Sequence, residues 1–169
     1  KSGAMDELKE LAEKAQIPVT NTLVGLGGFP GNHELALGMV GMHGSVAANN
    51  STEEADLVIA AGIRFHDRIT GHPDFFCKKA KIIHIDIDPA EIDKNVTINV
   101  PIVGDLKRVL SELNTLVEPT THEAWIAQIR EWQAEYPMVI PESKDGVLHP
   151  QYVLYELNKI AKADAVIVT

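Results

Sequence analysis

The feature that most constrains the fold is an alternation of amphipathic helical segments with short, almost wholly apolar segments. The apolar runs predict strands at 56–62, 81–88 and 98–103, with a shorter strand at 18–20. Strands that are apolar on both faces are typical of parallel sheets covered by crossover helices. We therefore predict an α/β fold, with a doubly wound, mainly parallel sheet and helices on both of its faces.

Helical segments are expected between and after these strands. Apolar residues at helical spacing predict helices at about 4–16, 33–40, 45–55 and 121–136. A further helix is expected to open at Gly104-Asp105, with its apolar face at Leu106, Val109, Leu110 and Leu113. This order of elements supports a single domain over residues 1–136.

The stretch 137–149 is rich in turn-forming residues and is predicted to be a linker. Beyond it, Pro150 is expected to begin a helix, and 165–169 reads as an apolar strand. Natural chains rarely end on a bare apolar strand, and this one also begins without Met. We therefore expect a piece of a longer polypeptide, in which 150–169 starts another domain.

Composition narrows the class of protein. The 169 residues include 15 Lys and Arg against 24 Asp and Glu, a net charge of −9, which disfavours nucleic acid or an anionic membrane as a partner. The single cysteine, Cys77, excludes an intramolecular disulfide framework and a Cys-rich zinc site, as fits a reducing compartment. No apolar run approaches the roughly 18 residues of a membrane span. We expect a soluble, cytoplasmic protein.

A Gly-rich segment follows the first predicted strand, at residues 22–31. Backbone N–H groups of such a loop can approach a phosphate. The spacing departs from the dinucleotide fingerprint, because the third glycine would fall at Pro30, and no Gly-Lys-Ser/Thr follows as in a P-loop. A phosphate cradle and an ordinary tight loop are both compatible with the sequence.

A second candidate is Gly41-Met42-His43-Gly44, in which two glycines bracket a histidine. Such a loop could offer a ligand close backbone approach and an exposed imidazole. The alternative is a helix that ends in glycine, followed by a capping or surface histidine. The other histidines show no metal-ligand spacing with one another or with Cys77, so no metal site is predicted.

Polar residues follow the predicted buried strands. Gly62 is followed by Arg64 and Arg68, which could meet phosphate oxygens or could be held by Asp67 in a solvated loop. Acidic residues end the next two strands, where a carboxylate can accept a hydrogen bond from a ribose hydroxyl: Asp86, Asp88 and Asp105. Asp105 could equally be a helix N-cap. Together these residues indicate a nucleotide crevice without a catalytic constellation.

The order of these segments resembles one family. The segments that carry the resemblance are 18–27, 38–44, 55–71, 84–89 and 103–105. Together they are similar to the middle domain of the large, catalytic subunit of acetolactate synthase, also called acetohydroxyacid synthase. The most specific parts are Gly-Met-His-Gly and the Arg-Phe-x-Asp-Arg-x-Thr-Gly segment that begins at Arg64.

The resemblance implies a Rossmann-like, FAD-binding central domain of a three-domain enzyme. Enzymes of that family use thiamine diphosphate and Mg²⁺ to condense pyruvate with pyruvate or 2-ketobutyrate, losing carbon dioxide, on the pathway to branched-chain amino acids. The FAD undergoes no net redox change. The family's catalytic glutamate and metal ligands lie in the first and third domains, so the resemblance implies no catalytic residue here and an inactive fragment.

The resemblance also implies partners and a ligand set. The partners are the flanking domains of the same chain, further copies in a homodimer or homotetramer, and a regulatory small subunit. The implied FAD contacts are Thr22, Leu23, Val40, Gly41, Met42, His43, Gly62, Arg64, His66, Arg68, Ile69, Asp86, Ile87, Asp105 and Leu106. It also makes Met42, Asp67 and Arg68 neighbours of the substrate channel, where the family's herbicides bind.

One position departs from the family pattern. His66 stands where the family usually shows Asp, which removes a negative charge beside the arginines and leaves the FAD contact at this position open. Two alternatives also stay open. The chain could be the middle domain of another thiamine diphosphate enzyme, binding ADP or no ligand, or it could be a free-standing nucleotide-binding or regulatory module.

Overall fold

The computed structural model describes residues 2–141, 146–162 and 165. The chain divides into two compact units, residues 1–136 and 137–169. The first unit contains every candidate site residue, and the second contains helix α6 (Pro150–Ile160). The predicted strand at 165–169 lies outside the described residues except for Ala165. The assignment of 137–149 to a linker and of 150–169 to a following domain stays a prediction.

Five strands form the framework of the first unit, and every pair of them is parallel. β1 (Val19–Asn21) pairs with β2 (Ala36–Met39) in one sheet. β3 (Leu57–Ala61), β4 (Lys81–Asp86) and β5 (Val100–Val103) form a second sheet in that order. The strands therefore run as a parallel α/β architecture requires.

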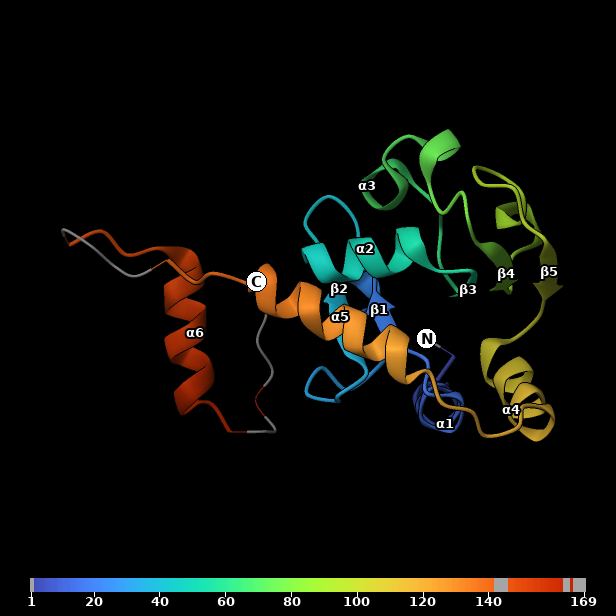
Figure 1. The fold of residues 1–169 in the computed structure, drawn as a ribbon, viewed down its shortest axis with the longest axis horizontal. Helices are drawn as coiled ribbons and strands as arrows, with labels where there is room; N and C mark the ends of the chain where they lie inside the picture. The colour runs from blue at the N-terminus through green and yellow to red at the C-terminus, as the bar shows by residue number, and fades with distance from the viewer. Residues whose placement is uncertain (1, 142–145, 163–164, 166–169) are drawn as a thin grey trace. The chain divides into compact units, whose positions relative to one another are not determined.

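The helices lie on both sides of these strands. Figure 1 places α2 (Val46–Glu54) and α3 (Asp67–Thr70) on one side, with α1 (Met5–Ala15) and α4 (Leu106–Leu116) on the other. α5 (Glu123–Glu135) packs against α2. The predicted α/β class is confirmed, as are the helices expected near 4–16, 45–55 and 121–136 and after Gly104-Asp105.

Short 3₁₀ turns connect several of these elements. They are η1 (Leu23–Gly25), η2 (Pro73–Phe75) and η3 (Pro89–Glu91). Among the residues that the structure describes, no helix is both long enough and apolar enough to cross a membrane.

The helix predicted at 33–40 is wrong, because this segment contains strand β2. Leu35 and Leu37 are buried and alternate with the less buried Ala36 and Gly38, which is the period of a strand. Gly38 has a φ of 79°, which a helix does not allow. Parallel pairing with β1 therefore overrides the local helical spacing.

Strand β4 separates two parts of the core. Ile83 and Ile85 face α1 and α4, where Ile85 and Leu110 have no exposed surface. Ile82 packs on the opposite face in a cluster with Phe65 and other buried side chains. Each face of the strand is thus covered, as expected for a parallel sheet whose strands are mostly apolar.

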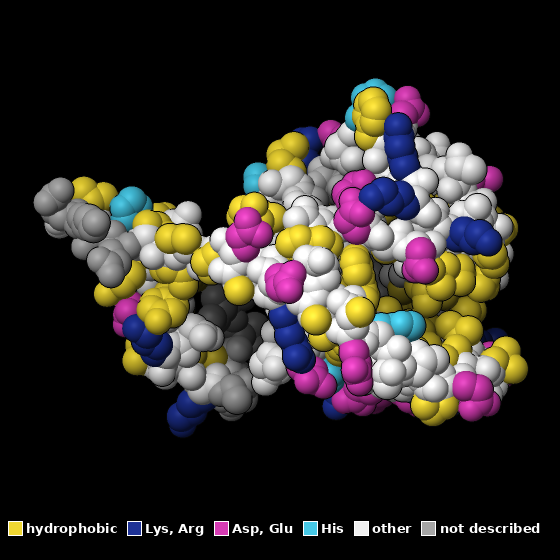
Figure 2. Space-filling model, viewed as in Figure 1, with side chains coloured by type: hydrophobic (Ala, Val, Ile, Leu, Met, Phe, Trp, Pro, Cys, Tyr) yellow, Lys and Arg dark blue, Asp and Glu magenta, His cyan; other side chains and the backbone are white. Residues whose placement is uncertain are grey.

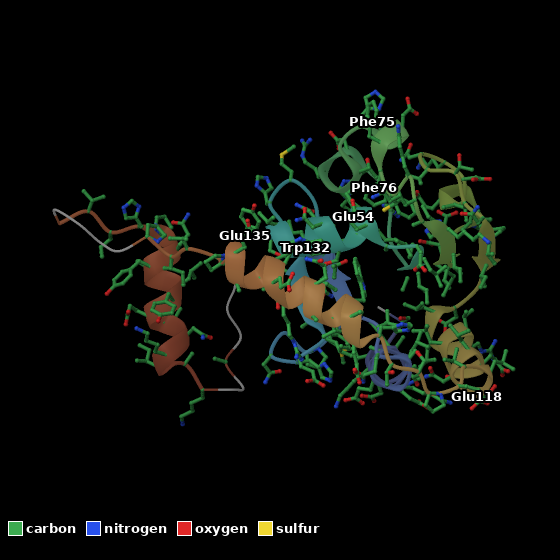
Figure 3. All side chains as sticks on the ribbon, viewed as in Figure 1. Glu54, Phe75, Phe76, Glu118, Trp132 and Glu135 are labelled. Carbon is green, nitrogen blue, oxygen red and sulfur yellow. The ribbon has the colours of Figure 1, made fainter. Side chains whose placement is uncertain are left out.

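The segment after η2 closes the second part of the core. Phe76 is buried and meets Phe65 in an edge-to-face contact with ring centroids 5.8 Å apart. Its neighbour Phe75 lies farther out, with 63% of its surface exposed (Figure 3). Cys77 is buried, and its thiol donates to the Thr52 carbonyl at 3.4 Å. Cys77 therefore fills space in this part of the core.

Helix α1 connects the two sheets. Leu8 packs both with the cluster around Ile85 and with the cluster around Phe29, which borders β1 and β2. Among the described strands, neither β1 nor β2 pairs with a strand of the other sheet, and α1 packs against both sheets. Figure 2 shows hydrophobic side chains gathered on the surface over the region of β5 and α4.

Candidate functional site

The candidate ligand residues cluster at the carboxyl ends of the parallel strands. Thr22 and Leu23 follow β1, and Val40–His43 follow β2. Gly62 follows β3, while Asp86 ends β4. Because the carboxyl ends of parallel strands meet at one edge of a sheet, this edge is the usual position of a ligand crevice in α/β folds.

The loop after β2 packs directly against α3. The backbone N–H of Met42 donates to the Arg68 carbonyl at 2.8 Å. A Cβ at Gly41 would collide with that carbonyl, and the φ of Gly41 is 102°, so only glycine fits here. Gly44 has no room for a side chain against the Met39 backbone. The two glycines of Gly-Met-His-Gly thus permit close backbone packing at the end of a strand rather than of a helix.

This packing leaves the two middle residues of the motif exposed. Met42 has 66% of its surface exposed, and His43 is exposed as well. Val40 and Ile69, in contrast, are buried in the cluster that includes Phe65. Of these candidate residues, Met42 and His43 are accessible to a ligand, while Val40 and Ile69 support the loop from the core.

Asn49 on α2 also holds this loop, although it was not among the residues predicted from the sequence. Its side chain accepts from the Gly41 N–H at 2.8 Å and donates to the Gly41 carbonyl at 3.1 Å. Both backbone groups of this glycine are therefore fixed by one amide side chain. A polar residue on the inner side of a predicted helix was the only available signal.

The Gly-rich loop at 22–31 is closed by its own hydrogen bonds. Thr22 Oγ1 accepts from the Gly25 N–H at 3.1 Å, and Asn21 Nδ2 donates to the Gly25 carbonyl at 2.8 Å. These are the contacts of a tight loop, and phosphate binding by this segment stays a prediction. Leu23 projects from the loop with 71% of its surface exposed.

The ends of β3, β4 and β5 are tied together by backbone hydrogen bonds. Gly62 N–H donates to the Ile85 carbonyl at 2.7 Å, and Gly104 N–H donates to the Asp86 carbonyl at 2.9 Å. Leu106 lies beside Gly62, since its Cδ2 would be 3.9 Å from a Cβ placed there. The structure therefore brings these candidate residues together.

The acidic candidates already accept local hydrogen bonds. Asp105 Oδ1 accepts from the Arg108 N–H at 3.1 Å and is the N-cap of α4. Asp86 Oδ1 accepts from the Asp88 N–H at 2.9 Å. Each carboxylate keeps a second oxygen, so a cap and a ligand contact are compatible. Ile87, which follows Asp86 at the end of β4, is 71% exposed.

Both arginines lie in the segment between β3 and the end of α3, and each has a carboxylate neighbour. Arg68 Nη1 lies 2.7 Å from Asp67 Oδ2, and Arg64 Nε lies 3.7 Å from Glu91 Oε1. The side chains of Arg64 and Arg68 are 72% and 62% exposed. Exposed ion pairs contribute little free energy, so an incoming anion could compete for either guanidinium.

His66 precedes α3 as its N-cap residue and makes no capping hydrogen bond with its side chain. Its imidazole is exposed, and its carbonyl accepts from the N–H groups of Ile69 and Thr70. The backbone of His66 is thus used to start the helix, while its side chain is accessible.

The site combines exposed apolar side chains with two guanidinium groups and two carboxylates. Such a surface suits a ligand with flat apolar rings, hydroxyl groups and an anionic linker.

Burial raises the pKa of the Cys77 thiol to about 12, so this cysteine is not an available nucleophile. In the described part of the chain, no group of His, Cys, Asp and Glu side chains could hold a metal ion.

Comparison with known proteins identifies related sequences. Residues 1–113 match the family model described as thiamine pyrophosphate enzyme, central domain. The chain is 47% identical over 171 residues to acetolactate synthase of Mycobacterium bovis, 44% identical over 171 residues to the acetolactate synthase large subunit of Parasynechococcus marenigrum, and 41% identical over 170 residues to chloroplastic acetolactate synthase 1 of Zea mays.

These alignments cover nearly all of this chain but a small part of each relative. They include 98% of the chain and 28% of the mycobacterial protein, 98% and 27% for the cyanobacterial protein, and 97% and 26% for the maize protein. The chain therefore spans less than a third of the length of these curated relatives.

Proposed function

Because the chain belongs to the thiamine pyrophosphate enzymes, as their central domain, we propose that it is the FAD-binding middle domain of an acetolactate synthase large subunit. The observation that carries this proposal is the identity of 41–47% with such enzymes along almost the whole chain. The parent enzyme would condense two 2-ketoacids with loss of carbon dioxide, and this domain would contribute cofactor binding without catalytic residues.

The residues at the carboxyl edge fit the chemistry of FAD. Arg64 and Arg68 can neutralise a diphosphate through charge-assisted hydrogen bonds. The free carboxylate oxygen of Asp86 can accept from a ribose or ribityl hydroxyl. Exposed apolar side chains can cover the flat rings, and Leu23, Met42 and Ile87 are 71%, 66% and 71% exposed. These three features support FAD over a ligand without an anionic part.

Thiamine diphosphate and Mg²⁺ would be bound by other domains of the parent. Thiamine diphosphate supplies the electron sink for decarboxylation of a 2-ketoacid. We expect this domain to orient the FAD and to form part of the wall of the site. Flanking domains, further copies of the subunit and a regulatory small subunit are the partners that we propose.

The first test uses the full-length subunit that carries this chain. Purified protein is expected to retain FAD and to form acetolactate from pyruvate when thiamine diphosphate and Mg²⁺ are added. Titration with ADP separates this proposal from a related domain that binds ADP. Tight ADP binding without FAD binding would contradict the proposed ligand. Absence of acetolactate formation from pyruvate would contradict the proposed activity.

Variants of the same subunit test the site itself. Arg68→Ala is expected to weaken FAD binding by roughly 10- to 100-fold, because one charge-assisted hydrogen bond contributes roughly 1.5–3 kcal/mol. Arg130→Ala is the matched control, because Arg130 is equally exposed, at 65%, and pairs with a carboxylate on another part of the surface. Equal FAD affinity of the two variants would remove Arg68 from the site.

The 169-residue chain alone provides a separate measurement. We expect it to bind FAD weakly, because neighbouring domains would supply the remainder of the pocket. Fluorescence titration should give a dissociation constant in the micromolar range or higher. Submicromolar affinity would mean that the central domain forms the whole FAD site.

A further inference from the structure

Buried His84 lies on β4, next to the segment that carries Arg64. The side chain of His84 has no exposed surface, and its ring meets the ring of Phe65 edge-to-face at 5.0 Å between centroids. It is therefore a polar ring in an apolar part of the core. A buried polar group costs free energy unless it is hydrogen-bonded, so the partner of this ring indicates what it does.

The imidazole donates to a single carbonyl. Nε2 of His84 lies 2.9 Å from the carbonyl oxygen of Ile63. Because a carbonyl oxygen only accepts, Nε2 must carry the proton. The other nitrogen, Nδ1, is buried with no hydrogen-bond partner among the described residues. The one side-chain hydrogen bond of this histidine is thus directed to the backbone immediately before Arg64.

A second side chain holds the backbone on the other side of Arg64. Asn95 Nδ2 donates to the Phe65 carbonyl at 2.7 Å. The His66 N–H also donates to the Arg64 carbonyl at 2.9 Å, which closes a tight turn. Both carbonyls that flank Arg64 are therefore fixed by side chains from outside the segment. The Arg64 side chain itself stays 72% exposed.

We propose that His84 is a positioning residue, which holds the backbone of Arg64 at the carboxyl edge so that its guanidinium can meet the anionic part of a flavin nucleotide beside Asp86. Nε2 of His84 lies 4.0 Å from Asp86 Oδ2, so one ring adjoins both the arginine segment and the acid at the end of β4. A fixed backbone lowers the entropy that the site loses when it binds a ligand. This inference rests on the proposed function.

Two substitutions of His84 separate the effect of its hydrogen-bond donor from the effect of its packing. The amide nitrogen of Gln and the terminal methyl of Met are each four bonds from Cα, as is Nε2 of His. Both substitutions remove the ring that contacts Phe65, but only Gln retains a donor for Ile63. His84→Gln and His84→Met are therefore a matched pair in the full-length subunit.

FAD titration is the first readout. His84→Met is expected to weaken FAD binding about tenfold, because the Ile63 carbonyl loses its donor, while His84→Gln should stay within about threefold of the unsubstituted protein. In an Arg64→Ala background, His84→Met should change the affinity by less than about twofold. Equal losses for Met and Gln, or an undiminished loss without Arg64, would overturn the proposal, since a purely structural histidine would behave in that way.

Hydrogen exchange of the apoprotein is the second readout and does not depend on FAD. The peptide that spans residues 62–68 should exchange faster in His84→Met than in His84→Gln, since only the former releases the segment. Equal exchange in the two variants would overturn the positioning role. If the unsubstituted subunit binds no FAD, the proposed function and the ligand role of Arg64 fail, while this exchange comparison still decides whether His84 holds the segment.

Discussion

Substitution of Gly41 by Ala tests whether the loop after β2 is built on close contact with α3. Gly41 has a φ of 102°, and a Cβ there would meet the Arg68 carbonyl and the Cα of Ile69. The positive φ alone costs a non-glycine residue roughly 1–2 kcal/mol. Displacement of α3 would also lengthen the Met42 N–H to Arg68 carbonyl bond, now 2.8 Å, at a further cost of about 1 kcal/mol. Gly41→Ala should therefore lower the free energy of unfolding by about 2–3 kcal/mol.

Urea unfolding of the purified chain, followed by circular dichroism, measures this loss. Gly27→Ala is the matched control, because Gly27 has a φ of 86° but a Cβ there would meet nothing within 4 Å. It should lose only the conformational part, about 1–2 kcal/mol. If the two variants are equally destabilised, contact with α3 contributes nothing and the reasoning about this loop is refuted.

Three further predictions concern the framework around the site. Asp105→Ala should destabilise the chain by about 1 kcal/mol, because it removes the N-cap of the 11-residue helix α4, whereas Asp88→Ala, which uncaps only the three-residue turn η3, should have a smaller effect on the urea midpoint. The Cys77 thiol, buried and with its pKa raised to about 12, should react with a thiol reagent at pH 8 only as the protein unfolds, and rapid labelling of the folded chain would contradict its described burial. Ile85→Ala, at a fully buried position, should cost about 2–5 kcal/mol, while Ile87→Ala, just beyond the end of β4 and at 71% exposure, should stay within about 0.5 kcal/mol. Similar urea midpoints for the two variants would contradict this difference in burial.

The parallel framework could be predicted because its signals are local. Strands β3, β4 and β5 consist mostly of apolar residues, and the serine before α2 and the aspartate before α4 each cap a helix as their residue types favour. The helix prediction for 33–40 was wrong because the apolar positions among these eight residues suit the period of a strand as well as that of a helix. The decisive facts were the φ of Gly38 and the pairing with β1, and neither can be read from the segment itself.

The position of the candidate site could be predicted from the sequence, but the side chains that hold its backbone could not. Residues that follow apolar strands could be assigned to the carboxyl edge by topology alone. The contacts of Asn49 with Gly41 and of His84 with Ile63 each join residues of different elements, so they depend on how those elements pack. Their residue types carry no mark of this role, since a histidine in an apolar strand is compatible with many partners.

The structure also explains why one motif can contain residues of two kinds. In Gly41-Met42-His43-Gly44, the glycines are fixed by backbone contacts, while Met42 and His43 remain accessible to a ligand. The same division holds in the segment after β3, where the backbone around Arg64 is held from the core and its guanidinium is exposed.

This division has a consequence for how substitutions should behave. Replacing a residue that holds the backbone should change both stability and ligand affinity, since the ligand groups lose their support. Replacing an accessible side chain such as Arg68 should change affinity with little effect on unfolding, because surface substitutions away from structural contacts usually stay within about 0.5 kcal/mol. The two measurements together therefore separate the scaffold of this edge from the groups that contact its ligand.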